Sequence, residues 1–294
     1  MTDEHRWYLV TRKRTEGFIA SAFRKLRQEG IEPILIKGWA AARNYPDGQT
    51  RFLGDIDLAV RADVYDKSVR LVYDQADPIT GVDLHRELRT LDTLDWETLF
   101  TRSHLVPLEN EDIRILAPED HLRVMCVHWL IDGGESKDRL WDIYYAVENR
   151  PADFDWSKCL DVTPAHRRGW IIATIGLAHR YLGLGIDDLP FAADAKHLPR
   201  WLTRCVERGW RSDVPMQPLQ NTLGDADSLL REVKKRLPPN PIQATVDCEG
   251  VFDDRSRIPY QARDFFIRIR PAIPRVIKNI FSRMRRRPVV DTSR

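Results

Sequence analysis

The first half of the chain alternates between helical and strand-like hydrophobic patterns. Apolar residues recur at helical spacing over residues 11–29, with basic residues on the remaining faces, and this predicts an amphipathic helix that ends at Gly30. Short apolar runs at residues 33–37, 54–60 and 81–85 are instead typical of β-strands. The succession of strand, helix and strand predicts a fold with an α/β start.

Two further segments complete the predicted sheet region. Residues 63–76 carry apolar residues among polar ones, which predicts a helix with Asp63 as its N-cap. Residues 105–108 and 113–116 are apolar runs separated by a polar segment, and they predict a hairpin that closes the sheet. Pro107 has no backbone N–H, so its strand should lie at an edge of the sheet or at a bulge.

From Pro118 onward the pattern becomes helical, so the fold class is predicted to be α+β rather than α/β throughout. Pro118 opens the first of these helices, Gly133 and Gly134 end it, and further helices are predicted over residues 137–147 and 165–182. Residues 237–241 are rich in proline, which predicts an extended linker.

The last part of the chain carries a basic amphipathic pattern. Apolar residues fall at helical spacing between Ile273 and Met284, and arginine and lysine fill much of the rest as far as Arg287. Three interpretations of this predicted helix, residues 273–287, remain open. It packs on its own domain, lies peripherally on an anionic membrane surface, or binds a partner or an acidic acceptor.

Composition narrows the class of protein. The chain has 294 residues, 43% of them hydrophobic and 31% charged, which is ordinary for a soluble globular protein. The net charge of +2 gives no argument for binding to a nucleic-acid template. No segment resembles a secretory signal or a bilayer span, so we expect a cytoplasmic protein. No two cysteines form a Cys-x-x-Cys pair, which argues against structural zinc or a disulfide framework and fits a reducing compartment.

The candidate chemistry begins with two aspartates in the second predicted strand. Asp55 and Asp57 are two residues apart, so they point to one face of that strand. Two carboxylates on one face repel each other, and a divalent cation is the simplest partner that makes the pair favourable. Oxygen ligands point to Mg²⁺ or Mn²⁺. Asp-x-Asp is also a common tripeptide at strand starts and in turns, so the pattern needs support from its surroundings.

Two neighbouring segments give that support. Lys37 and Gly38 end the preceding strand, and glycine allows the backbone to approach a phosphate closely. Asp83 lies in the next strand of the pattern and shares a face with His85. Three acids on two adjacent strands beside a glycine turn make a much stronger combination than the tripeptide alone.

These motifs resemble a known superfamily. A strand that ends in Lys-Gly, then a helix, then Arg-x-x-x-Asp-x-Asp, then Val-Asp-Leu-His is similar to the nucleotidyltransferase superfamily of DNA polymerase β. More narrowly, the chain resembles the uncharacterised nucleotidyltransferases, in which Lys-Gly stands where Gly-Gly or Gly-Ser is commoner. The resemblance covers roughly residues 15–190. It implies a small mixed sheet flanked by helices, followed by a helical domain.

The resemblance also assigns roles to particular residues. It implies three catalytic and metal-binding carboxylates, five nucleotide-binding residues and one residue on the possible acceptor side: Asp55, Asp57 and Asp83; Lys37, Gly38, Arg51, His128 and Asp142; and His85. A histidine on an apolar helix is more often a hydrogen-bonded core residue, so His128 has that second interpretation. We interpret three aromatic residues of the next helix as core rather than as a base-stacking platform: Trp141, Tyr144 and Tyr145.

The implied domain organisation has three parts. Residues 1–117 are expected to form a nucleotidyltransferase catalytic domain, residues 118–205 a helical cap, and residues 206–294 an extension with the linker and the basic helix. The implied activity is metal-dependent transfer of a nucleoside monophosphate or a phosphate from ATP or GTP. The acceptor would be a hydroxyl of a small molecule, sugar or peptide, with tailoring of a peptide natural product as one case. The alternative is a non-catalytic nucleotide-binding or regulatory module on the same fold.

Overall fold

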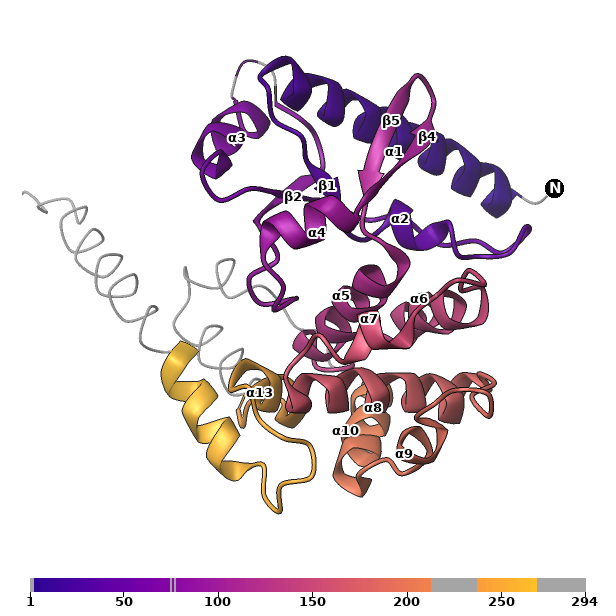
Figure 1. Ribbon diagram of the computed structural model, residues 1–294, viewed down its shortest axis with the longest axis vertical. Coiled ribbons are helices and arrows are strands. Elements are labelled where there is room, and N and C mark those ends of the chain that lie inside the picture. The colour runs from indigo at the N-terminus through magenta and orange to yellow at the C-terminus, as the bar shows by residue number, and fades with distance from the viewer. Residues whose placement is uncertain (1–2, 75, 77, 213–236, 269–294) are drawn as a thin grey trace, which may run out of the picture.

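The computed structural model describes residues 3–74, 76, 78–212 and 237–268 (Figure 1). Residues 258–268 are helical as well. The named elements, in chain order, are α1 (Asp3–Gln28), β1 (Ile34–Leu35), α2 (Trp39–Ala42), β2 (Ile56–Val60), α3 (Tyr65–Val72), β3 (Val82–Arg86), α4 (Trp96–Arg102), β4 (His104–Leu108), β5 (Glu111–Ile115), α5 (Pro118–Ile131), α6 (Lys137–Glu148), α7 (Trp156–Leu160), α8 (Ala165–Leu182), α9 (Ala192–Lys196), α10 (Arg200–Trp210) and α13 (Pro241–Asp247).

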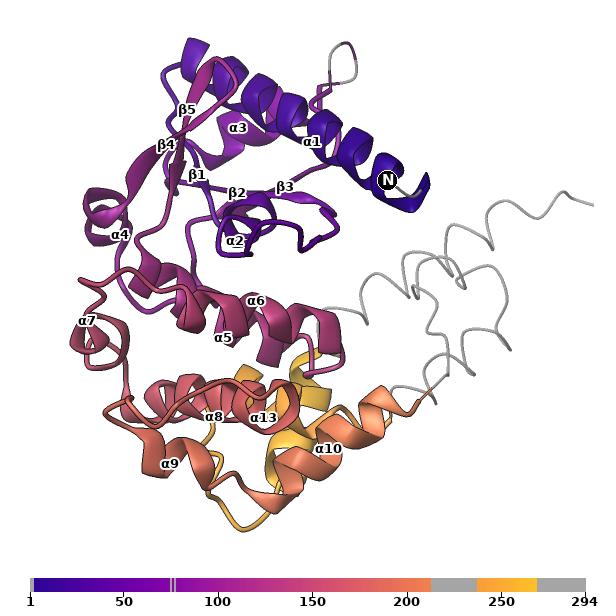
Figure 2. The ribbon, with the colours of Figure 1, turned by 90° about the vertical axis from the view of Figure 1, so that its right-hand side faces the viewer.

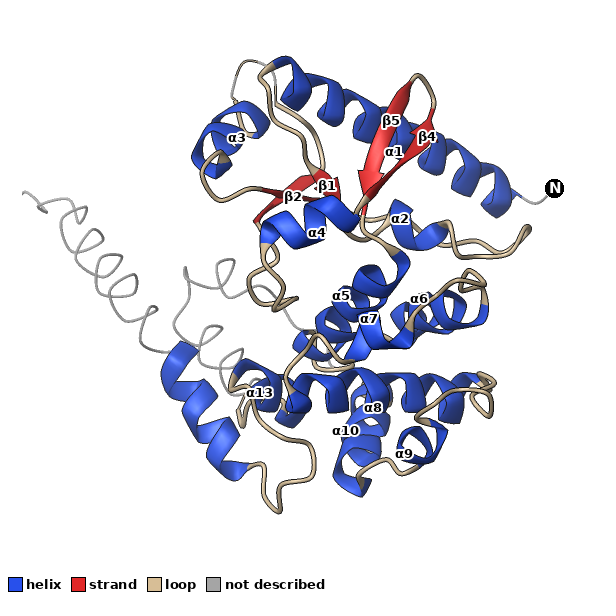
Figure 3. Ribbon diagram, in the orientation of Figure 1, coloured by secondary structure: helices blue, strands red, loops and turns tan. Residues whose placement is uncertain are grey.

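The strands form one mixed five-stranded sheet in the order β3-β2-β1-β5-β4. β2 pairs with β3 and β1 with β5 in parallel, whereas β1–β2 and β4–β5 are antiparallel. The sheet and the helices that follow it confirm the predicted α+β class with a small mixed sheet and a helical region (Figure 3). The predicted hairpin is confirmed as β4 and β5, and Pro107 lies in β4, at the edge of the sheet.

Alternation along the strands gives the sheet two apolar faces. Leu35 and Leu58 face a core shared with α1 and α3, while Ile34 and Ala59 face a second core under α4. Val124 of α5 also belongs to this second core. The sheet is therefore covered on both sides, and α5 joins it to the helical region (Figure 2).

The helices after the sheet pack around a third and larger core. α5, α6, α8 and α13 contribute to it, and the two largest fully buried side chains are Trp129 and Trp170. The indole of Trp170 donates a hydrogen bond of 2.9 Å to the carbonyl of Gly250. The segment after residue 240 is thereby fixed against α8, although it lies 80 residues further along the chain.

Two local predictions are wrong. The first helix begins at Asp3 rather than at residue 11. α3 has Val64 rather than Asp63 at its N-cap, because the Asp63 carboxylate pairs with the guanidinium of Arg61 at 2.6 Å instead. Competition from a nearby arginine is a tertiary effect that cap preferences do not contain.

The predicted end of the linker at residue 241 is also wrong. Pro241 is the first residue of α13, and the Asn240 side chain caps that helix by accepting hydrogen bonds from the backbone N–H groups of Ile242 and Gln243. Proline suits the first turn of a helix because its missing N–H would have no partner there. α10 continues across the predicted domain boundary at residue 205. The predicted helix over residues 273–287 lies outside the described residues.

Within the described ranges, no helix is both long enough and apolar enough to cross a membrane.

Candidate functional site

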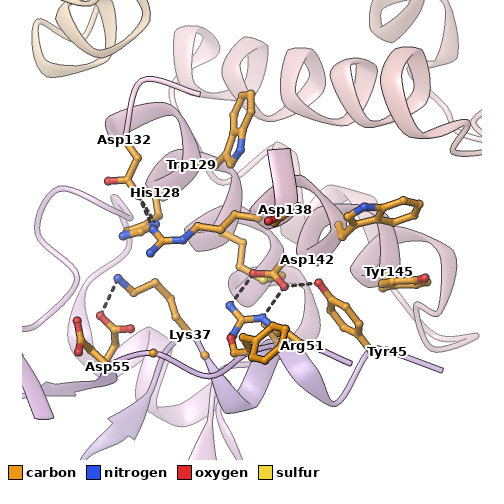
Figure 4. A pocket seen from close by; sticks show the side chains of 18 of the residues that line it. Lys37, Tyr45, Arg51, Asp55, His128, Trp129, Asp132, Asp138, Asp142 and Tyr145 are labelled. Atoms are coloured by element: carbon orange, nitrogen blue, oxygen red, sulfur yellow. Dashed lines mark hydrogen bonds and ion pairs between the residues drawn. The ribbon is translucent and has the colours of Figure 1, made fainter. Parts of the chain in front are cut away.

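A cleft of about 680 Å³ lies where the sheet region meets α5 and α6 (Figure 4). Its walls come from the turn after β1, the loop of residues 43–55 before β2, the strands β2 and β3, and the facing helices. The lining residues are Lys37, Gly38, Ala41, Tyr45, Gln49, Thr50, Arg51, Phe52, Gly54, Asp55, Asp57, Asp83, Met125, His128, Trp129, Asp132, Asp138, Arg139, Trp141, Asp142 and Tyr145. Eight of the nine residues predicted for the site line this cleft, and the ninth, His85, lies beside it against Asp57.

Strand register brings the acids of β2 and β3 together. Asp57 and Asp83 are direct partners in the parallel pair, so their side chains leave the sheet on the same face. His85 is two residues further along β3, on that same face, and its imidazole reaches back to Asp57. Alternation along the strand predicted that Asp83 and His85 share a face. Which residues of β2 they meet depends on the strand register, which no sequence pattern contains.

The acids form a compact charged group. Nζ of Lys37 lies 2.7 Å from Oδ1 of Asp57, and Nε2 of His85 lies 3.1 Å from the same oxygen and 3.4 Å from Oδ2 of Asp83. Burial alone would raise the Asp57 pKa, but the hydrogen bond with His85 and the Lys37 ammonium together lower it below its ordinary value. Asp57 is therefore held as a carboxylate. Asp55 is exposed and lines the cleft just before β2 begins.

The donor set suits a metal ion. One ligand atom from each of Asp57, Asp83 and His85 can be chosen so that all three lie within 4.8 Å of one another. The two carboxylates match the preferences of Mg²⁺ and Mn²⁺, which favour carboxylate oxygens, whereas the imidazole of His85 is a ligand that softer divalent ions favour. The group differs from the predicted ligand set, since it includes His85 and leaves Asp55 at the rim of the cleft.

Gly38 joins this group to the turn after β1. Its backbone has a φ of 61°, which is strained for any residue with a side chain, and a Cβ there would lie 3.4 Å from the carbonyl oxygen of Asp55. The glycine therefore lets the Lys37 turn lie directly against the segment that enters β2. α2 starts at the next residue and has a single turn, so its helix dipole is small. The negative charge of a ligand here would therefore be balanced by the Lys37 side chain rather than by the helix.

A second ionic group fastens the loop of residues 43–55 to α6. The guanidinium of Arg51 binds both carboxylate oxygens of Asp142, at 2.6 and 2.7 Å, and the hydroxyl of Tyr45 donates to the same carboxylate at 2.8 Å. The side chains of Arg51 and Asp142 are largely buried. These two residues were both predicted to bind nucleotide, and the structure pairs them with each other. We call Arg51, Asp142 and Tyr45 the latch.

The wall formed by α5 is also paired. Nδ1 of His128 lies 3.5 Å from Oδ2 of Asp132, and that oxygen accepts a hydrogen bond of 2.6 Å from Arg139. Burial, together with the nearby Lys37 ammonium, lowers the His128 pKa to about 4. His128 is thus neutral at neutral pH and faces the cleft, rather than being enclosed in the core.

Aromatic residues of α6 correct one interpretation from the sequence. Tyr144 packs against the helical core as predicted, but Trp141 and Tyr145 line the cleft. Their rings are stacked, with centroids 5.5 Å apart and an interplanar angle of 24°. Tyr45 packs against Tyr145 at 4.5 Å. An aromatic stripe at helical spacing looks the same whether it borders a core or a cleft, and sequence reasoning also missed Tyr45 and Asp138 here.

Residues 8–75 match the family model described as uncharacterised nucleotidyltransferase. This segment carries the nucleotidyltransferase family pattern. The match confirms the resemblance predicted from the motifs, and it includes Lys37, Gly38, Asp55 and Asp57 but ends before Asp83. β3, which carries Asp83, pairs in parallel with β2 of the matched segment.

The other comparisons add one structure. The crystal structure of an antigenic nucleotidyltransferase-like protein from Paracoccidioides brasiliensis is similar, with a TM-score of 0.43 and 13% sequence identity. The alignment covers 62% of this chain and 92% of that chain. No curated protein matches the sequence.

Proposed function

We propose that this nucleotidyltransferase-family protein is a metal-dependent enzyme that transfers a nucleoside monophosphate, or a phosphate, from a nucleoside triphosphate to a hydroxyl. The observation that carries the proposal is the convergence of Asp57, Asp83 and His85 within 4.8 Å, beside Lys37 at the floor of a large cleft. A structural ion pair would not need this excess of acid, since Asp55 and Asp83 add negative charge beyond what Lys37 balances.

Asp57 and Asp83 would hold Mg²⁺ or Mn²⁺, with Asp55 at the rim and His85 beside them. Such an ion lowers the pKa of a bound hydroxyl and offsets charge on phosphate oxygens. The family resemblance implies this ion, and the carboxylates present fit it.

The protein's own groups would then divide the work. The acceptor oxygen forms a bond to phosphorus while the bond to the leaving group breaks, and the hydroxyl proton passes to the carboxylate of Asp83. The leaving group is pyrophosphate if a nucleoside monophosphate moves and a nucleoside diphosphate if a phosphate moves. Asp83 is suited to this because its side chain is 60% exposed, against 13% for Asp57, so an acceptor can reach it. Lys37 would offset the charge that develops on the leaving group.

The acceptor is proposed only by class, as a small molecule, sugar or peptide that presents a hydroxyl. Incubation with Mg²⁺, ATP or GTP and candidate acceptors, followed by mass measurement of the product, tests the reaction. A gain of one nucleoside monophosphate or one phosphate supports transfer and decides which group moves. Metal-dependent nucleotide binding without any turnover, across all acceptors, would instead favour the non-catalytic module on this fold.

A further inference from the structure

The cleft has a second end, built by α6 and the loop of residues 43–55, that the proposed phosphate chemistry does not use. Figure 4 shows Tyr45 and Tyr145 on the far side of the Arg51–Asp142 pair from Lys37 and Asp55. Trp141 belongs to this end because its ring stacks on Tyr145. We call Trp141, Tyr145 and Tyr45 the aromatic wall.

The polar groups of Trp141 and Tyr145 lie in the cleft without a partner from the described part of the protein. Across residues 3–74, 76, 78–212 and 237–268, neither the indole N–H of Trp141 nor the hydroxyl of Tyr145 makes a hydrogen bond. The same is true of other aromatic residues, among them Trp156 and Tyr144, but those pack on the helical core, whereas Trp141 and Tyr145 line the cleft. Trp129 also lines the cleft, and its indole donates to a backbone carbonyl at 2.8 Å. Partly exposed rings with open polar groups are suited to a flat ligand that carries hydrogen-bonding atoms.

The latch fixes the shape of this end. The hydroxyl of Tyr45 is held by Asp142, and its ring leans on Tyr145, so the aromatic wall is in place without a ligand. Asn149 adds another tie between α6 and the loop, by donating to the carbonyl of Asn44 at 2.7 Å. A rigid aromatic surface binds a planar ring with little loss of side-chain entropy.

We propose that the aromatic wall is the nucleobase subsite of this protein, with the base stacked on Trp141. The proposal rests on the proposed function for the position of the triphosphate at Lys37 and the acid group. A nucleotide placed in this way spans the inner length of the cleft, and the exposed side of Asp83 stays open for the acceptor.

Asp138 gives this subsite a hydrogen-bond acceptor. It lies in the first turn of α6, lines the cleft one turn before Trp141 and Asp142, and makes no ion pair within the described part of the chain. A carboxylate only accepts hydrogen bonds, so Asp138 would accept from an N–H group at the edge of the base.

The test compares two nucleoside triphosphates with a ligand that has the phosphates but lacks the nucleoside. The full-length protein, with Mg²⁺ present, is titrated by calorimetry with ATP, with GTP and with inorganic tripolyphosphate. Trp141→Ala should weaken the binding of one or both nucleotides by about tenfold or more, as expected for loss of base stacking. The affinity for tripolyphosphate should stay within about twofold of wild type, because the phosphate end is untouched.

Two controls separate this role from a structural one. Trp141→Phe keeps a ring for stacking and should recover most of the nucleotide affinity. Trp156→Ala removes a ring of α7 that packs on the helical core and does not line the cleft, so it should leave the ratio of nucleotide to tripolyphosphate affinity unchanged. Equal weakening of nucleotide and tripolyphosphate by Trp141→Ala would overturn the subsite.

The outcome is independent of turnover, so it separates the two proposals. Unchanged nucleotide affinity in Trp141→Ala, with a raised KM for the acceptor alone, would make the aromatic wall an acceptor site and overturn the base assignment while the enzyme stands. Selective loss of nucleotide affinity in a protein that transfers nothing would support the subsite and reject the enzyme.

Discussion

Two groups of charged residues lie within this molecule, and they are built in opposite ways. Beneath α4, the guanidinium of Arg123 is enclosed between the carboxylates of Asp92 and Asp120, at 2.8 and 2.6 Å, and Arg102 adds a second cation at 3.1 Å from Asp120. In the cleft, Asp57 and Asp83 share Lys37 and His85, and Asp55 adds a further acid. The first group is buried and balanced, whereas the second is partly exposed and has surplus negative charge.

The difference shows what each group does. Arg123 also donates to the carbonyl of Lys158 at 2.8 Å, so it ties together the segment before α4, the helix α5 and the helix α7. A buried group in which cations and carboxylates alternate holds elements in place. Surplus acid at a cleft costs stability unless a cation arrives, and it is therefore the mark of a binding site. The predictions that follow test this division, from the largest expected effect to the smallest.

Asp57→Asn should lower nucleotide transfer by at least about a thousandfold, because the central carboxylate of the acid group is lost. The fold should remain, because asparagine has the shape of aspartate and its amide oxygen can still accept a hydrogen bond from Lys37. Turnover measured with Mg²⁺ and ATP or GTP checks the loss of transfer, and urea unfolding checks that the fold remains. Transfer close to the wild-type rate would end the assigned role of Asp57.

Arg123→Ala should lower stability, whereas Asp57→Asn should lower transfer and leave the fold intact. It leaves two buried carboxylates without their shared cation, and we expect a loss of about 3–5 kcal/mol in the free energy of unfolding. Arg61→Ala is the matched control, because its pair with Asp63 is solvent-exposed and water screens the attraction, so the free energy of unfolding should barely change. Equal destabilisation by the two changes would contradict the structural role of the buried group.

Low pH should reduce the free energy of unfolding through protonation of His121, which lies in the first turn of α5. Burial lowers the His121 pKa to about 4, so the folded state binds a proton there more weakly than the unfolded chain does. Its stabilising contribution is present above the ordinary histidine pKa of about 6.5 and declines as pH falls towards 4, by roughly 3 kcal/mol in all. Urea unfolding at pH 7, 5 and 4 measures this decline, and His121→Leu should show a shallower one. Parallel pH profiles for the two proteins would reject His121 as the source.

Asp142→Asn should have a milder effect on function than Asp57→Asn. It removes the charge that holds Arg51, which loosens the loop that carries Asp55, and nucleotide affinity should fall by about tenfold. Asn149→Ala breaks a weaker tie between the same loop and α6, so its effect should be smaller. Calorimetric titration with ATP and with GTP compares them. A larger loss from Asn149→Ala than from Asp142→Asn would show that the latch does not position the loop.

The sequence predicted the acid group better than its surroundings. Strand alternation is local, so it paired Asp55 with Asp57 and Asp83 with His85, and the family motif linked the acids of the two strands. The pairing of Arg51 with Asp142 joins residues 91 positions apart, and no local rule contains it. Trp141 was assigned to the core because a helical stripe of aromatics carries no record of which surface it meets. These misses lie where the sheet region and the helices meet, so they depend on tertiary packing.

The most direct test of the central claim is Mn²⁺ binding to the full-length protein, followed by electron paramagnetic resonance. Wild-type protein should bind Mn²⁺ in competition with Mg²⁺, and Asp57→Asn and Asp83→Asn should each weaken that binding by about tenfold or more. Asp132→Asn, which removes another carboxylate of the same cleft, should change the Mn²⁺ affinity by less than about twofold. Equal Mn²⁺ affinity in wild type, Asp57→Asn and Asp83→Asn would contradict the account.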